Sequence, residues 1–224
     1  TVFGHSMGGL IATALVDRLY HQRHCLPANL ILSSPAFRPG FNPDDESSSF
    51  LRRVHHFSVF LKRRSYLKPV AKFMGALASL KGRENTAWAE KHISDLEIER
   101  EIYRLDPMIS ASSRVSFLLS IESLMVEMES FAQDFTLPLA IFYGEGDPIV
   151  DSEGTDEFLA RFSENAQSSE PSVLKLKAFP YHELLRSSRA EECEAFLLKS
   201  LQRNSAHAEI GAPMSVVGIK KDDS

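Results

Sequence analysis

One stretch decides the fold of this chain: Gly4-His5-Ser6-Met7-Gly8-Gly9. It lies between a short apolar segment, residues 1–3, and residues 10–21, whose apolar positions recur at helical spacing. A serine with glycine two positions away on each side, placed between a strand and a helix, is typical of a sharp turn that projects a nucleophile from a sheet. The sequence therefore predicts that Ser6 is a nucleophile held in an elbow.

The elbow predicts a role for each of its neighbours. Side chains larger than hydrogen at Gly4 and Gly8 are expected to clash with the strand or the helix, and His5 is expected to support the turn. The Met7 N–H lies near a helix N-terminus, where it can face the oxyanion that develops in acyl transfer.

The rest of the chain indicates an α/β fold with a mostly parallel sheet. Apolar runs at 30–36, 138–143 and 172–179 predict strands, and 153–162 and 189–201 predict helices. About 100 residues with mainly helical patterns separate the second and third strands, which is too long for a loop. We therefore expect a core of residues 1–37 and 137–203, a helical cap of residues 38–136, and a disordered tail of residues 204–224.

A serine nucleophile needs a base, and the base needs a carboxylate that orients it. Asp147 directly follows a predicted strand, and His182 follows the last one, so the order Ser, Asp, His fits this architecture. Asp151 is the alternative acid, although its position favours a helix cap. No spacing typical of a metal site occurs, and we expect neither metal nor cofactor.

Three segments together resemble the monoacylglycerol lipase and lysophospholipase group, also described as serine aminopeptidase-type α/β-hydrolases. They are Gly4-His5-Ser6-Met7-Gly8-Gly9, Leu139-Ala140-Ile141-Phe142-Tyr143-Gly144-Glu145-Gly146-Asp147-Pro148, and Tyr181-His182-Glu183-Leu184-Leu185. The resemblance covers residues 1–37 and roughly 105–200. It implies a catalytic triad of Ser6, Asp147 and His182, an oxyanion donor at Met7, and an acyl-ester lipid as substrate.

The same resemblance implies that the chain is the C-terminal part of an α/β-hydrolase fold. The first strands of the family and the loop that supplies its other oxyanion donor are not found in this sequence. We therefore expect an upstream part to be missing and the 224-residue chain alone to be inactive. Two other interpretations stay open: a peptidase or small-ester hydrolase with the same triad, and an inactive truncated remnant.

The charge of the predicted cap is uneven. Residues 51–83 hold nine Lys and Arg and no Asp or Glu, whereas the whole chain has a net charge of −5. Cationic helices that also carry aromatic and aliphatic residues favour an anionic membrane surface, so peripheral membrane contact is predicted. Nucleic acid is not an expected partner, because no binding motif accompanies the charge. The two cysteines, Cys25 and Cys193, favour a reducing, cytoplasmic location.

Overall fold

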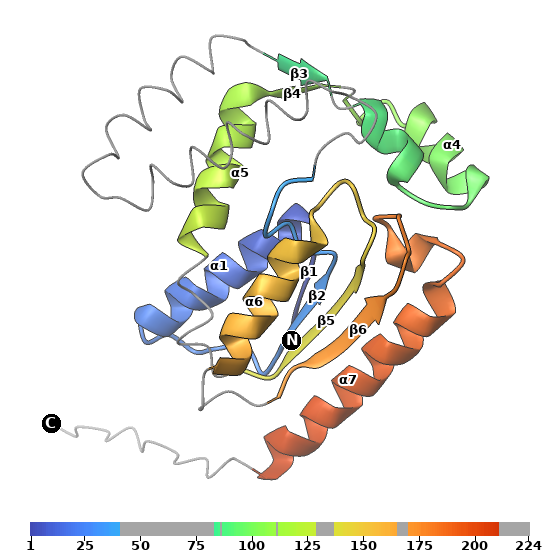
Figure 1. The fold of residues 1–224 in the computed structure, drawn as a ribbon. Helices are drawn as coiled ribbons and strands as arrows, with labels where there is room; N and C mark the ends of the chain where they lie inside the picture. The colour runs from blue at the N-terminus through green and yellow to red at the C-terminus, as the bar shows by residue number, and fades with distance from the viewer. Residues whose placement is uncertain (41–82, 86, 111, 129–136, 165–169, 211–224) are drawn as a thin grey trace, which may run out of the picture.

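A computed structural model describes residues 1–40, 83–85, 87–110, 112–128, 137–164 and 170–210 (Figure 1). The basic segment of residues 51–83 lies outside the described residues, except for the backbone at position 83. The described part therefore contains the predicted core apart from residues 165–169, and it includes residues 87–110 and 112–128 of the predicted cap.

The core is a four-stranded parallel sheet, which confirms the predicted class. Its strands are β1 (Val2–His5), β2 (Leu30–Ser33), β5 (Leu139–Gly144) and β6 (Ser172–Leu176), in the order β1-β2-β5-β6. All three pairings are parallel, with Gly4 opposite Leu32 and Leu32 opposite Ile141. Because parallel strands end at the same edge, the loops that follow β1, β2, β5 and β6 gather there.

Both faces of the sheet are covered, as a parallel sheet requires. Figure 1 shows α1 (Met7–His21) and α6 (Ser152–Glu164) on one face and α7 (Ala190–Ile210) on the other. Alternate side chains of the strands face the two layers. Leu30 and Ile141 pack in the cluster that includes Phe158 of α6, whereas Ile31 and Phe142 pack in the cluster that includes Cys193 of α7.

The described part of the cap lies beyond the carboxyl ends of the strands (Figure 1). It comprises β3 (Arg83–Asn85), the 3₁₀ helix η2 (Ala87–His92), α4 (Glu97–Leu105), β4 (Ser112–Arg114) and α5 (Val115–Glu127). Strands β3 and β4 pair antiparallel, whereas we expected the cap to be almost entirely helical. These strands are three residues long and polar, so they carry no alternating apolar pattern that would have revealed them.

The end of the chain also differs from the expectation. Helix α7 continues to Ile210, whereas the disordered tail was expected to begin at residue 204. The continuation contains Ala206 and Ala208, and alanine has the highest helix propensity. Residues 211–224 lie outside the described part. Within the described residues, none of the helices combines the length and the hydropathy needed to cross a membrane.

Candidate active site

The elbow at Ser6 has the backbone geometry that a projecting side chain requires. Ser6 has φ 54° and ψ −125°, a region that residues other than glycine rarely occupy. The strained residue is held on both sides, since its N–H donates to the carbonyl oxygen of Ser33 (2.9 Å) and its own carbonyl accepts from Ala36 N–H (3.0 Å). Backbone strain of this kind persists only where the surroundings enforce it, and it is concentrated at functional sites.

The glycines of the elbow have unequal roles. A Cβ at Gly4 would lie 2.6 Å from the carbonyl oxygen of Gly8, so glycine is required there. A Cβ at Gly8 would meet nothing within 4 Å, and our expectation of a clash at that position was therefore wrong. The close approach is at Gly9 instead, where a Cβ would lie 2.9 Å from Cβ of Pro35, a residue that follows β2.

Asp147 and His182 lie together as predicted. Nδ1 of His182 is 2.6 Å from Oδ2 of Asp147, and the two side chains are 4% and 1% exposed, respectively. The other carboxylate oxygen of Asp147 accepts the N–H groups of Ile149 (2.8 Å) and Val150 (3.3 Å). A carboxylate fixed in this way orients the imidazole, so that Nδ1 carries the proton and Nε2 can accept one.

Two glycines bring the loops of Asp147 and His182 into contact. A Cβ at Gly144, the last residue of β5, would lie 2.6 Å from the carbonyl oxygen of Phe179. Gly146 N–H donates to that same carbonyl (3.1 Å), and a Cβ at Gly146 would approach Pro180 to 3.3 Å. The small residues between β5 and Asp147 therefore let the chain that leads to His182 run directly beside them.

His5, the residue before Ser6, contacts this pair. The rings of His5 and His182 are tilted against each other with 4.9 Å between their centroids. The structure contains no hydrogen bond between the Ser6 hydroxyl and His182, both of which are described. Met7 begins α1, so its N–H belongs to the first turn, where amides have no partner within the helix.

Three supporting groups escaped the sequence prediction. Ser34 is buried with φ 40°, and its hydroxyl donates to the His182 carbonyl (3.2 Å). His182 N–H donates to the carbonyl of His92 (3.0 Å), and Glu183 N–H to that of Ile93 (2.8 Å), so the cap is bonded to the histidine loop. Backbone contacts cannot be predicted from residue types. Ser34, however, is a polar residue directly after a predicted buried strand, and this position could have indicated a supporting role.

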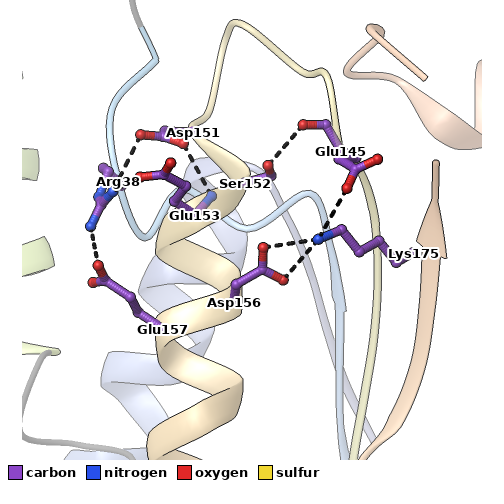
Figure 2. A network of polar contacts seen from close by, with 8 residues as sticks. All are labelled: Arg38, Glu145, Asp151, Ser152, Glu153, Asp156, Glu157 and Lys175. Atoms are coloured by element: carbon purple, nitrogen blue, oxygen red, sulfur yellow. Dashed lines mark hydrogen bonds and ion pairs between the residues drawn. The ribbon is translucent and has the colours of Figure 1, made fainter. Parts of the chain in front are cut away.

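Asp151 has a different role from Asp147. Its side chain accepts the N–H of Glu153 (3.0 Å) in the first turn of α6, which confirms the predicted helix cap. Figure 2 shows that Asp151 also lies beside the guanidinium of Arg38, which pairs with Glu153 (2.7 Å) and Glu157 as well. The Arg38 backbone completes the link, because its carbonyl accepts Asp151 N–H (3.1 Å). This frame holds the loop after Asp147 against the chain that leaves β2.

A second cation in Figure 2, Lys175, ties β6 to α6 on the side of the helix opposite Arg38. Lys175 lies 2.9 Å from Asp156 and 3.5 Å from Glu145, and the Tyr143 hydroxyl donates to Asp156 (2.5 Å). Desolvation by burial, together with this hydrogen bond, raises the pKa of Tyr143 above its usual range, so the phenol stays protonated. Among the described residues, no group of three or more His, Cys, Asp or Glu could hold a metal ion.

Comparison with solved structures identifies the fold. Monoacylglycerol lipase from Paleococcus ferrophilus matches with a TM-score of 0.62 at 18% identity, over 91% of this chain and 67% of that one. A soluble variant of monoglyceride lipase from Saccharomyces cerevisiae, in complex with a substrate analogue, gives 0.60 and 16%, over 92% of this chain and 61% of that one. The chain thus spans about two thirds of these proteins. No curated protein sequence matches significantly.

The family assignment is independent of these structures. The sequence model of the family described as serine aminopeptidase, S33, matches residues 1–188, which include the elbow, the Asp147 loop and the His182 loop. The chain therefore belongs to the serine aminopeptidase S33 family of α/β-hydrolases.

Proposed function

We propose that the protein is a serine ester hydrolase that cleaves monoacylglycerols or lysophospholipids through Ser6, Asp147 and His182. The observation that carries this proposal is the buried pair of Asp147 and His182, whose side chains lie 2.6 Å apart. The His182 ring contacts His5, the residue before Ser6, and the backbone of Ser6 has a positive φ. A buried carboxylate on Nδ1 leaves Nε2 as a base for a serine hydroxyl. The stability of the fold alone does not explain why a histidine and an aspartate are buried together in this way.

The reaction proceeds in two halves. Oγ of Ser6 attacks the ester carbonyl carbon while Nε2 of His182 takes the proton of the hydroxyl. The oxyanion that results forms near the Met7 N–H. His182 then gives that proton to the leaving alkoxide, which departs as the alcohol and leaves an acyl group on Ser6. Water attacks the acyl-enzyme with His182 again as base, which releases a fatty acid and restores Ser6. Every step uses groups of the chain, substrate and water.

A lipid substrate is supported by the apolar surface of the cap. Helix α4 and the turn after it expose six large apolar side chains: Leu96, Ile98, Ile102, Leu105, Met108 and Ile109. Leu105 and Met108 are 70% and 87% exposed. An exposed apolar group of this size is typical of a surface that meets another apolar phase. Two of the similar structures are named as lipases of monoacylglycerol, which agrees with this substrate class.

Peripheral contact with anionic membranes is part of the same proposal. The nine cations of residues 51–83 are expected to hold the cap at such a surface, each by up to about 1 kcal/mol. Sedimentation with neutral and anionic vesicles tests this. Replacing Ile98, Ile102 and Leu105 with serine should weaken binding to both, whereas replacing Arg52, Arg53, Lys62, Arg63 and Arg64 with glutamine should remove only the preference for anionic vesicles. Leu198→Ser on α7, 59% exposed, is the matched control.

A peptidase is the second candidate, because the matching family model is described as a serine aminopeptidase. The two functions share the triad and differ in the substrate that the cap admits. A peptidase specific for free amino termini needs an anionic group near Ser6 to bind the ammonium, whereas an acyl chain needs an apolar lining.

The deciding experiment uses the full-length protein. A fluorophosphonate probe should label Ser6, and Ser6→Ala should abolish the labelling. Turnover is then compared on a monoacylglycerol, a lysophospholipid and an aminoacyl arylamide. Hydrolysis of either lipid with no cleavage of the arylamide supports the proposal. Labelling that persists in Ser6→Ala would show that the nucleophile is wrong, and arylamide cleavage alone would favour the peptidase.

A further inference from the structure

His5 and Glu183 form a second histidine–carboxylate pair next to the first. Nε2 of His5 lies 3.1 Å from Oε1 of Glu183, and Nδ1 of His5 lies 3.2 Å from the hydroxyl of Ser33. The two side chains are 28% and 29% exposed, so the pair is largely withdrawn from water. Both ring nitrogens of His5 therefore have a partner, which fixes the rotation of the ring.

This pair contacts the proposed base directly. The His5 ring lies against the His182 ring at 4.9 Å between centroids, and Glu183 is the next residue along the chain. The partners of His5 fit the tautomer in which Nε2–H donates to Glu183 and Nδ1 accepts from Ser33.

We propose that His5 and Glu183 are positioning residues for His182: Glu183 orients His5, the His5 ring fixes the rotation of the His182 ring, and the Glu183 carboxylate is a second anion that stabilises the imidazolium. The inference rests on the proposed function for its catalytic consequence. The pairing itself concerns only groups that the structure describes.

The electrostatics of Glu183 agree with this role. The pKa of Glu183 lies below its usual range; the hydrogen bond with His5 is the largest cause, burial opposes it, and the charges of His5, His182 and Arg186 act in the same direction. Glu183 is therefore an anion at neutral pH. The titratable groups around His182 and Glu183 come from several elements: Asp147 after β5, His5 of β1, Arg186 of η4 (Leu184–Arg186) and Tyr103 of α4.

A purely structural alternative is that the pair only ties β1 to the histidine loop. The two roles predict different results for Glu183→Gln. Glutamine keeps an oxygen that can accept from His5 but carries no charge, so a structural tie would survive. A positioning anion would be lost, and His182 would give up its proton more easily.

The test combines kinetics with a titration that does not need turnover. Esterase kcat and KM are measured from pH 5 to 9 for the full-length wild type, Glu183→Gln, Glu183→Ala and His5→Asn. The titration midpoint of the His182 ring is followed by NMR in the same proteins. Glu192→Gln, which removes an exposed partner of Arg189 on α7, is the matched control.

We expect both glutamate variants to move the His182 midpoint, and the acidic limb of the kcat/KM profile, to lower pH by up to about one unit. Glu183→Ala and His5→Asn should lower kcat by about 10- to 100-fold with KM changed less than about threefold, because a misplaced base impairs the chemical step. Glu183→Gln should lie between these variants and the wild type.

Two outcomes would overturn the inference. One is a His182 midpoint in Glu183→Gln equal to that in Glu192→Gln, and the other is an unchanged kcat in His5→Asn. If Glu183→Ala does not fold, Glu183→Gln and His5→Asn still decide the matter. If the wild type hydrolyses no ester, the proposed function fails, while the NMR titration still reports whether Glu183 acts on His182.

Discussion

Oδ2 of Asp147 faces Nδ1 of His182 at 2.6 Å, and the same carboxylate accepts two backbone N–H groups from the loop that follows it. One oxygen of the Asp147 carboxylate is therefore fixed by its own loop, and the other orients His182. Asp151, four positions further on, satisfies a helix terminus and pairs with Arg38 instead. Two aspartates that are four positions apart thus have different roles, and substituting each one should have a different effect on activity.

Asp147→Asn is expected to lower kcat by about 10⁴-fold, because an amide at this position favours the wrong tautomer of His182 and cannot stabilise an imidazolium. Asp151→Asn retains a side-chain oxygen that can cap α6 and should change kcat less than about threefold. Steady-state ester hydrolysis measures both. The reverse order of effects would identify Asp151 as the acid.

Gly4→Ala and Gly8→Ala should differ in stability although both alter the elbow. The Gly4 variant forces a methyl group to within 2.6 Å of backbone and should cost about 1–3 kcal/mol of unfolding free energy or more. Alanine at Gly8 meets open space within α1 and should be neutral or stabilising by about 0.5–1 kcal/mol. Urea unfolding followed by circular dichroism gives both values. A destabilised Gly8→Ala protein would contradict the open space seen there.

Ser94 provides a test of the link between cap and histidine loop. Its buried hydroxyl donates to the Arg186 carbonyl (2.5 Å) and accepts Leu96 N–H (3.1 Å). Ser94→Ala leaves these groups unpaired and should cost about 1–3 kcal/mol. Amide hydrogen exchange at His182 and Glu183 should then accelerate. Ser163→Ala, which removes an exposed hydroxyl from α6, should leave this exchange unchanged.

The two cysteines should react at very different rates. Cys25 is exposed, whereas Cys193 is fully buried and desolvation raises its pKa to about 11. At pH 8 only about one Cys193 thiol in a thousand is ionised, even before access is considered. Iodoacetamide followed by peptide mass spectrometry should therefore modify Cys25 in the native protein and Cys193 only after urea is added. Equal modification of both in the native state would show that α7 does not cover the sheet there.

Glu183 should make the free energy of unfolding depend on pH in the acidic range. Its pKa in the folded protein lies below the usual 4.5, so its stabilising contribution is complete above that value and is lost as the pH falls through the folded pKa. Glu183→Gln should be less stable than the wild type at pH 7 and should lose less stability below about pH 4.5. Urea unfolding at several pH values measures this. Parallel curves for the two proteins would show that Glu183 has the same pKa folded and unfolded.

The sequence predicted the sheet and the site elements because each carries a local signal. The sequence of the elbow, the apolar runs at 138–143 and 172–179, and the turn at Asp147 are all short-range patterns, although β6 ends at Leu176 and not at residue 179. It could not predict that Gly9 rather than Gly8 lies close to the chain after β2, because that depends on where Pro35 lies in space. The pairing of β3 with β4 and the bonds from His92 and Ile93 to the histidine loop depend on backbone groups, which every residue has alike.

The main-chain bonds between the cap and the histidine loop bear on how such a hydrolase can diversify. His92 and Ile93 meet His182 and Glu183 in a fixed register, so a change in the length of either segment would break these bonds. Replacing the cap with that of a relative would change the segment around His92 and Ile93 but not the segment around His182 and Glu183. A working chimera should therefore need residues 182–188 from the same donor.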